Sequence, residues 1–319
     1  MKTDNTGLAR FSIGQFGANV GVILWGAYVR ASGSGAGCGK HWPLCNGQVI
    51  PRAPSVQTLI EFAHRLSSGA VLLLAVVGAL LASRRTPAGH VLRKTAWAIV
   101  ALTMTEAIIG AAIVLLEHTG ISVAERRGIS ITLHLVNTFA LLVALSLHVR
   151  AAHGRDPQFP TGWRAWATVA VLAVVLATGA SGAIAALGDT LFPVQSLADG
   201  LIQDRSPTSH LFVRLRVYHP LFATVSLATL LFGVPLFRRG RPPGLAATLT
   251  KVVPLLAALQ YGLGVVNLAL LAPIPLQLIH LLLADVLWCS IVWLMAELSR
   301  DEARLTGAGA TLALPESET

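Results

Sequence analysis

Eight long apolar segments alternate with more polar connections along the chain. A helix of about 20 apolar residues crosses the hydrocarbon core of a bilayer, and each segment reaches that length. The pattern therefore predicts an all-α integral membrane protein with eight transmembrane helices. The expected spans lie at about residues 11–31, 58–83, 95–116, 129–151, 164–188, 209–237, 247–271 and 276–298.

The two halves of this pattern repeat each other. A long connection follows the first span of each half, at about 32–57 and 189–208. Self-similarity in a fixed order indicates an internal repeat, although any one match between helices rich in alanine, glycine and leucine can arise by chance. We expect two pseudosymmetric four-helix bundles, in residues 1–155 and 156–319. The repeated positions are Gly26 and Gly182, Glu106 and Gln260, Gly110 and Gly264, and His134 and His280.

Composition and charge agree with a membrane protein. Of the 319 residues, 54% are hydrophobic and 12% are charged, whereas soluble domains carry about 25% charged residues. The net charge of +9 comes from basic residues between the apolar runs, which argues against nucleic acid as a partner and for the lipid bilayer. By the positive-inside rule, the basic connections at 84–94, 155 and 238–251 face the cytoplasm. We therefore expect a multi-pass protein of the cell membrane with both termini cytoplasmic.

Four histidines lie near the outer ends of the even-numbered spans: His64, His134, His219 and His280. An imidazole inside a bilayer is costly and usually has a function or a partner. Facing pairs at one depth predict a metal or haem site in each bundle, toward the outer leaflet. Zinc favours a tetrahedral shell with cysteine or carboxylate ligands, so haem iron between two imidazoles fits better. The alternative is a hydrogen-bonded structural role.

The other six histidines are predicted to be solvated or to lie at the membrane interface. They are His41, His90, His118, His148, His153 and His210.

Glu61 lies one helical turn before His64. One interpretation is an ion pair with Arg65, four residues further on. The other is an acid, base or charge stabiliser beside a bound cofactor. The second half has a cation, Arg216, three residues before His219. This difference predicts that the two haem sites have different functions.

Cys38 and Cys45 share one short connection on the predicted outer side, where disulfides are permitted. Glycines and a proline between them allow a small ring to close. Either a structural crosslink or a dithiol that exchanges electrons fits this position. Cys289, deep in the last span, is expected to be a packed apolar residue.

Several motifs resemble those of the haem A synthase family, and the resemblance covers nearly the whole chain. The family has eight helices in two bundles and oxidises the methyl group of haem O to the formyl group of haem A, used by cytochrome oxidase. The motifs are Tyr28-Val29-Arg30-x-Ser32-Gly33, Trp42-Pro43-Leu44-Cys45, Glu61-Phe62-x-His64-Arg65, Leu133-His134-Leu135-x-Asn137, Gly188-Asp189-Thr190-Leu191-Phe192-Pro193, His219-Pro220 and Ile279-His280-Leu281.

The resemblance implies a role for each site residue. His64 and His134 would bind the iron of the substrate haem O, and His219 and His280 would ligate a haem B cofactor. Glu61 would be the catalytic carboxylate, and Cys38–Cys45 the outer disulfide, of an oxidoreductase acting on a CH group. Haem O synthase and the assembly of cytochrome oxidase would be its functional partners, with an electron donor that the sequence does not identify.

The chain departs from the family pattern at two places. Some members carry a second cysteine pair in the connection that matches 189–208, and this chain has none there. Glu106 occupies a position where the family tends to place an amide.

Two other functions remain as alternatives. A membrane cytochrome with two bis-histidine haems would only transfer electrons, and a haem carrier or assembly factor would bind haem without turnover. The Glu61/Arg216 difference favours an enzyme over both.

Overall fold

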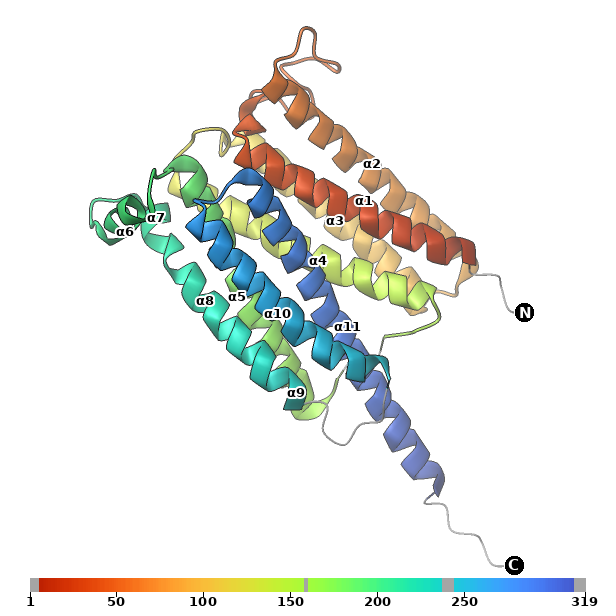
Figure 1. The fold of residues 1–319 in the computed structure, drawn as a ribbon. Helices are drawn as coiled ribbons and strands as arrows, with labels where there is room; N and C mark the ends of the chain where they lie inside the picture. Colours follow the sequence, from red (N-terminus) through yellow and green to blue (C-terminus); the bar gives the residue numbers. More distant parts are fainter. Residues whose placement is uncertain (1–5, 158–159, 237–243, 313–319) are drawn as a thin grey trace, which may run out of the picture.

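The computed structural model describes residues 6–157, 160–236 and 244–312, and these parts are helical (Figure 1). Within them no strand forms beyond an isolated bridge between Cys45 and Gln48. Seven helical segments are long and apolar enough to cross a membrane. They are α2 (Val56–Arg85), α3 (Val91–Leu115), α4 (Glu125–Ala152), α5 (Gly162–Leu191), the segment Leu211–Leu236, α10 (Leu245–Ala269) and α11 (Ile274–Leu312).

The first predicted span corresponds to α1 (Thr6–Ala31), which is as long as the others but more polar. Ser12, Gln15 and Asn19 point inward and are 1–3% exposed. Ser12 and Asn19 donate to carbonyls of the preceding turn, those of Ala9 and Gln15, and so satisfy their donors within the helix. Because these polar side chains lower its hydropathy, α1 is not among the seven, and an eight-span topology stays a prediction.

The sixth predicted span is interrupted. It consists of α7 (Leu211–Arg216), α8 (Tyr218–Ala228), a π-helical turn η2 (Thr229–Gly233) and α9 (Val234–Leu236). Pro220 has no backbone N–H to donate to the carbonyl of Arg216, and its ring crowds that carbonyl, which explains the break at Val217. The break puts His219 in the first turn of α8.

The helices contact one another in two closed groups (Figure 1). Helix α1 contacts α2, α2 contacts α3, α3 contacts α4, and α4 returns to α1. In the second half α5 contacts α8, α8 contacts α10, α10 contacts α11, and α11 returns to α5. Helix α4 also contacts α5 and α11, and α1 contacts α11, so the two groups share a long interface.

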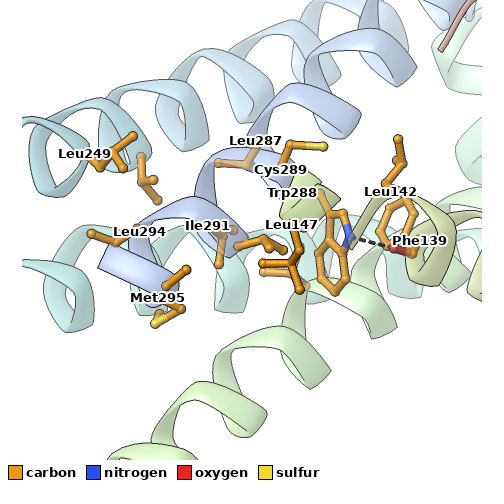
Figure 2. Packing of buried hydrophobic residues seen from close by; sticks show 14 of the residues in the cluster. Phe139, Leu142, Leu147, Leu249, Leu287, Trp288, Cys289, Ile291, Leu294 and Met295 are labelled. Atoms are coloured by element: carbon orange, nitrogen blue, oxygen red, sulfur yellow. Dashed lines mark hydrogen bonds between the residues drawn. The ribbon is translucent and has the colours of Figure 1, made fainter. Parts of the chain in front are cut away.

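That interface contains the main apolar core (Figure 2). Leu142 of α4 and Ile291 and Leu294 of α11 are fully buried there. The ring of Trp288 packs on Phe139, and its Nε1 donates to the Phe139 carbonyl at 2.9 Å. Burial of large apolar side chains on both helices fixes how the two halves meet.

Two connections at one end of the helices are ordered by short helical segments. The connection after α1 contains η1 (Ser34–Ala36), and the connection after α5 contains α6 (Leu197–Arg205). Both were predicted as long outer connections, and both lie beside the predicted histidine sites.

Candidate functional site

The second histidine pair comes from α8 and α11. The ring centroids of His219 and His280 are 6.5 Å apart, and the ring planes are perpendicular. A metal held about 2 Å from one nitrogen of each ring separates the centroids by roughly 6 Å. The spacing of this pair therefore suits one metal between two imidazoles.

Hydrogen bonds orient the ring of His219. Its Nδ1 lies 3.2 Å from the carbonyl of Thr178 and 3.2 Å from the hydroxyl of Ser181. The carbonyl can only accept, so Nδ1 carries the proton and Nε2 keeps its lone pair. This is the arrangement in which histidine ligands usually bind a metal.

His280 has a different partner. Its Nε2 lies 3.2 Å from Nε2 of Gln260 on α10, and its Nδ1 is buried without a hydrogen-bond partner. Of the first pair, His64 likewise has a buried Nδ1 without a partner. Unpartnered buried nitrogens are costly, and a bound group that contacts them would remove that cost.

Three of the four imidazoles lie directly against a glycine of a neighbouring helix. A Cβ added at Gly26 would come within 2.9 Å of His64 Cε1, and one at Gly182 within 2.9 Å of His219 Cε1. A Cβ at Gly264 would lie 3.1 Å from Cε1 of His280. The sequence had shown these glycines only as markers of the repeat, and the structure gives the physical reason for them.

The fourth imidazole, His134 on α4, is held differently. Its Nδ1 is in ion-pair contact with Oε2 of Glu106 on α3. The other carboxylate oxygen, Oε1, accepts from the hydroxyl of Thr138 at 2.8 Å. A Cβ at Gly110, the repeat mate of Gly264, would meet nothing within 4 Å.

Glu61 is buried, with 4% of its surface exposed, and both oxygens are hydrogen-bonded. Oε1 accepts from Nε and Nη2 of Arg65 at 3.1 and 2.5 Å, so the ion pair expected from the sequence is present. Oε2 accepts from the backbone N–H of Cys38 at 2.8 Å. Arg65 also donates to the carbonyls of His41 and Leu44. Glu61 and Arg65 together fasten the cysteine connection to α2.

The structure contains the Cys38–Cys45 disulfide. Both cysteines are buried, at 0 and 1% exposure, beneath the connection they close. The backbone N–H of Cys38, one of the two disulfide cysteines, donates to the carboxylate of Glu61. The sequence alone did not predict this contact.

Arg216 plays the same structural part in the second half. It donates to Asp204 at 2.6 Å, to Asp189 at 3.1 Å and to Gln203 at 3.1 Å. Asp204 and Gln203 belong to α6, so Arg216 fastens the second long connection. Glu61 and Arg216 have opposite charges, yet each attaches the long connection of its own half to the helices near a histidine.

Some buried polar residues were missed or misplaced by sequence reasoning. Arg30, at the end of α1, donates to the carbonyl of Ala186, to Thr190 and to Gln277. Its partners lie more than 150 residues away, so no local pattern identifies them. His118 and His148, predicted to be solvated and interfacial, are instead 8 and 1% exposed and bond Ser130 and Thr95. Each sits where α3 packs closely on α4.

A shallow groove separates α1 and α2 beside the first histidine pair. Its volume is about 440 Å³, and its lining is almost wholly apolar. Ala63 and Ser67, which flank His64 in the sequence, line it together with Trp25 of α1.

The donor set suits a metal that brings ligands of its own. In the described part of the chain, no three His, Cys, Asp or Glu side chains gather in a way that could hold a bare metal ion. Two imidazoles from facing helices are enough for iron that is already bound by a porphyrin. The two histidine pairs fit haem on this criterion.

Comparison with known proteins agrees with this chemistry. A family model described as "Cytochrome oxidase assembly protein" (COX15-CtaA) matches residues 9–292. A relative from Thermus thermophilus named "Protoheme IX farnesyltransferase" is 43% identical over 90% of this chain, which covers 48% of that protein.

Other relatives are named "Heme A synthase", among them two from different bacteria. The protein from Alkalihalophilus pseudofirmus is 32% identical over 45% of this chain and 48% of its own length. The protein from Shouchella clausii is 38% identical over 34% of this chain and 36% of its own length. The chain thus spans about half the length, or less, of these relatives. Because the family model covers nearly the whole chain, this protein belongs to the COX15-CtaA family, the family of the haem A synthases.

Proposed function

We propose that the protein is a haem A synthase, which oxidises the methyl group of haem O to the formyl group of haem A. The observation that carries this proposal is the presence of two histidine pairs, of which the second has ring centroids 6.5 Å apart. Membership of the family supports it. The product would serve cytochrome oxidase assembly, and haem O synthase would supply the substrate.

On this proposal the chain divides into two pseudosymmetric bundles with different tasks. Residues 1–155 bind haem O between His64 and His134, and residues 156–319 bind haem B between His219 and His280. The closed contacts of α1–α4 and of α5, α8, α10 and α11 support this division. The protein would lie in the cell membrane with its termini in the cytoplasm and both haem sites toward the outer leaflet.

The two sites supply different chemistry. Haem B held by two imidazoles would supply electron transfer rather than oxygen binding. His219 of α8, whose Nδ1 proton is held by the Thr178 carbonyl, and His280 of α11 would be the residues that hold it. In the first half, the apolar groove between α1 and α2 gives a route from the bilayer toward His64.

Glu61 is the proposed catalytic carboxylate. The methyl group would be oxidised in two successive hydroxylation-level steps. If water supplies the oxygen, each step releases two electrons and two protons, and the electrons must pass to an external oxidant that the chain itself does not supply. Loss of water from the resulting diol gives the aldehyde. A buried carboxylate at this site can stabilise positive charge at the reacting carbon or take a proton from attacking water. Arg65 and the Cys38 N–H, which hold both oxygens in place, keep that carboxylate oriented.

The overall reaction is tested by haem extraction. Membranes that contain this chain together with a haem O source should yield haem A, and membranes with the same source but without the chain should not. If haem is bound and recovered unchanged, the protein is a carrier or an electron-transfer cytochrome instead.

Glu61→Gln tests the catalytic carboxylate. The amide keeps the volume and can still accept from the Cys38 N–H, but it carries no charge and cannot take a proton. We expect a folded protein that retains haem B and forms haem A about 100- to 10,000-fold more slowly, the usual range for losing an acid–base group. Haem A is measured after extraction.

Arg65→Gln is the matched control for Glu61→Gln. It breaks the same ion pair and the same attachment of the cysteine connection, but it leaves the carboxylate in place. An equal loss of haem A formation in both variants would show that the ion pair only holds the cysteine connection in place, and the catalytic role of Glu61 would be wrong.

Farnesyl transfer is a second candidate, because the Thermus thermophilus relative carries that name at 43% identity. The present chain covers 48% of that protein, so the named activity can belong to the part without a counterpart here. Supplying protohaem and farnesyl diphosphate separates the two functions. Formation of haem O would favour the transferase, and formation of haem A from haem O the synthase.

A further inference from the structure

The two halves differ in the residue that faces the last histidine of each. In the second half an uncharged amide, that of Gln260, lies 3.2 Å from His280. In the first half a carboxylate, that of Glu106, is in ion-pair contact with His134. These residues occupy matching places on α10 and α3, four positions before Gly264 and Gly110.

Glu106 is held from two sides by α4. Its Oε2 contacts Nδ1 of His134, and its Oε1 accepts from Thr138, one turn further along α4. Asn137 donates to the carbonyl of Leu102 at 2.9 Å, which fixes α3 against α4 one turn before Glu106. The carboxylate side chain is 14% exposed. Its position is therefore set by the packing of both helices.

His134 also lacks the glycine contact that its repeat mate has. The ring of His280 lies against Gly264, whereas nothing would meet a Cβ at Gly110. The orientation of His134 thus depends on Glu106 rather than on contact with the α3 backbone.

A carboxylate that accepts from Nδ1 has two effects on an imidazole ligand. It keeps the proton on Nδ1, so that Nε2 is the nitrogen that faces the metal, and it makes the ring a stronger electron donor. A stronger donor and a nearby negative charge both favour the ferric state of a bound haem. Gln260 has no effect of this kind on His280, because its amide contacts Nε2 of that ring and Nδ1 has no partner.

We propose that Glu106 is a positioning residue that orients His134 and lowers the reduction potential of the haem bound in the first half relative to the haem in the second half. The proposal rests on the proposed function, since it requires haem between His64 and His134. It explains why a carboxylate stands at this place in one half only: the two halves would hold haems of different potential.

Glu106→Gln in the full-length protein tests this role. The variant places at 106 the residue type found at 260 in the second half, and it removes the negative charge beside Nδ1 of His134. With haem O as the titrated ligand, we expect affinity at the first site to fall by about 10- to 100-fold, as is usual when the partner of a metal-bound histidine is removed. The midpoint potential of that haem should rise. Spectroelectrochemical titration measures the potential.

Gln260→Glu tests the effect of negative charge alone. It introduces a carboxylate beside Nε2 of His280 rather than Nδ1, and the haem B potential should fall because of the added charge. Thr138→Val removes the second contact of Glu106 together with the bond from Thr138 to the His134 carbonyl, and it should raise the potential of the first haem by less than Glu106→Gln does. If Glu106→Gln does not fold, the Thr138→Val shift decides instead.

The outcomes separate this inference from the proposed function. Unchanged affinity and potential in a folded Glu106→Gln protein, or in Thr138→Val where the former does not fold, overturn the role of Glu106 and leave the proposed function intact. If His134→Ala leaves haem O binding unchanged, the first haem site itself is wrong, and the inference is overturned with it.

Discussion

At the scale of single residues, the glycines opposite the histidines are as informative as the histidines. Gly26, Gly182 and Gly264 let an imidazole approach the backbone of the next helix more closely than any side chain would permit. A ligand ring must be held in one orientation to bind a metal well. The glycine contacts supply part of that orientation without a polar partner.

Alanine substitutions at glycines of the second half should give a graded series. A Cβ at Gly182 would lie 2.9 Å from His219, one at Gly264 would lie 3.1 Å from His280, and one at Gly262 would meet nothing within 4 Å. We expect haem B content, read from the low-spin spectrum, to fall most in Gly182→Ala and less in Gly264→Ala. Gly262→Ala should keep it.

Two control variants set the limits of the expected change in haem B content. His280→Ala, which removes a ligand, should abolish the haem B signal. Gly262→Ala should not destabilise the helix, since alanine is favoured over glycine in helices by about 1 kcal/mol. Normal haem content in Gly182→Ala would contradict the importance of the close approach.

At the scale of elements, the apolar pattern located seven membrane-spanning segments within a few residues. Long apolar runs predict such helices well because the bilayer fixes their length. The pattern could not show the break at Val217, which depends on Pro220, or that the polar side chains of α1 face inward. Nor could it show that Arg30 bonds α5 and α11, since those contacts form only when distant helices pack.

Only part of the candidate site could be predicted from the sequence, because the rest depends on contacts between distant residues. The four histidines and the cysteine pair stand in local motifs. The bond from the Cys38 N–H to Glu61, and the contact of Glu106 with His134, join residues on different elements. Their geometry comes from packing, which the sequence alone does not give.

The disulfide closes a ring within the connection that Glu61 and Arg65 attach to α2. In a Cys289→Ala background, which leaves only two cysteines, Cys38 and Cys45 should resist thiol labelling until a reductant is added. Both are buried and paired. Closing a loop of this size stabilises it by about 2–3 kcal/mol, so reduction should speed proteolysis of residues 32–55. Labelling without reductant would contradict the crosslink.

At the scale of the whole molecule, the two halves are joined by a buried ion pair as well as by the apolar core. Arg150 of α4 donates to Glu297 of α11 at 2.7 Å, and these side chains are 2 and 7% exposed. Arg155, which is far more exposed, reaches the same oxygen at 3.4 Å. Removing one partner of a buried pair leaves the other charge uncompensated.

Arg150→Met should therefore destabilise the protein by about 3–5 kcal/mol. Thermal unfolding in detergent measures this loss. The double variant Arg150→Met/Glu297→Leu should recover most of the stability, because it removes the stranded charge as well. If the single and double variants unfold alike, Arg155 compensates for Arg150 and the pair is not needed to join the halves.

The groove between α1 and α2 has a consequence for how the protein meets its reactant. Its lining is almost wholly apolar, so on the proposed function a reactant dissolved among the acyl chains would enter it directly from the bilayer. A molecule that arrives by this route diffuses in two dimensions, and its supply depends on its mole fraction among the lipids. On the proposed function, the bulk concentration of haem O would therefore not set the rate. Adding empty micelles at a fixed amount of haem O would slow haem A formation by surface dilution, although the protein itself is unchanged.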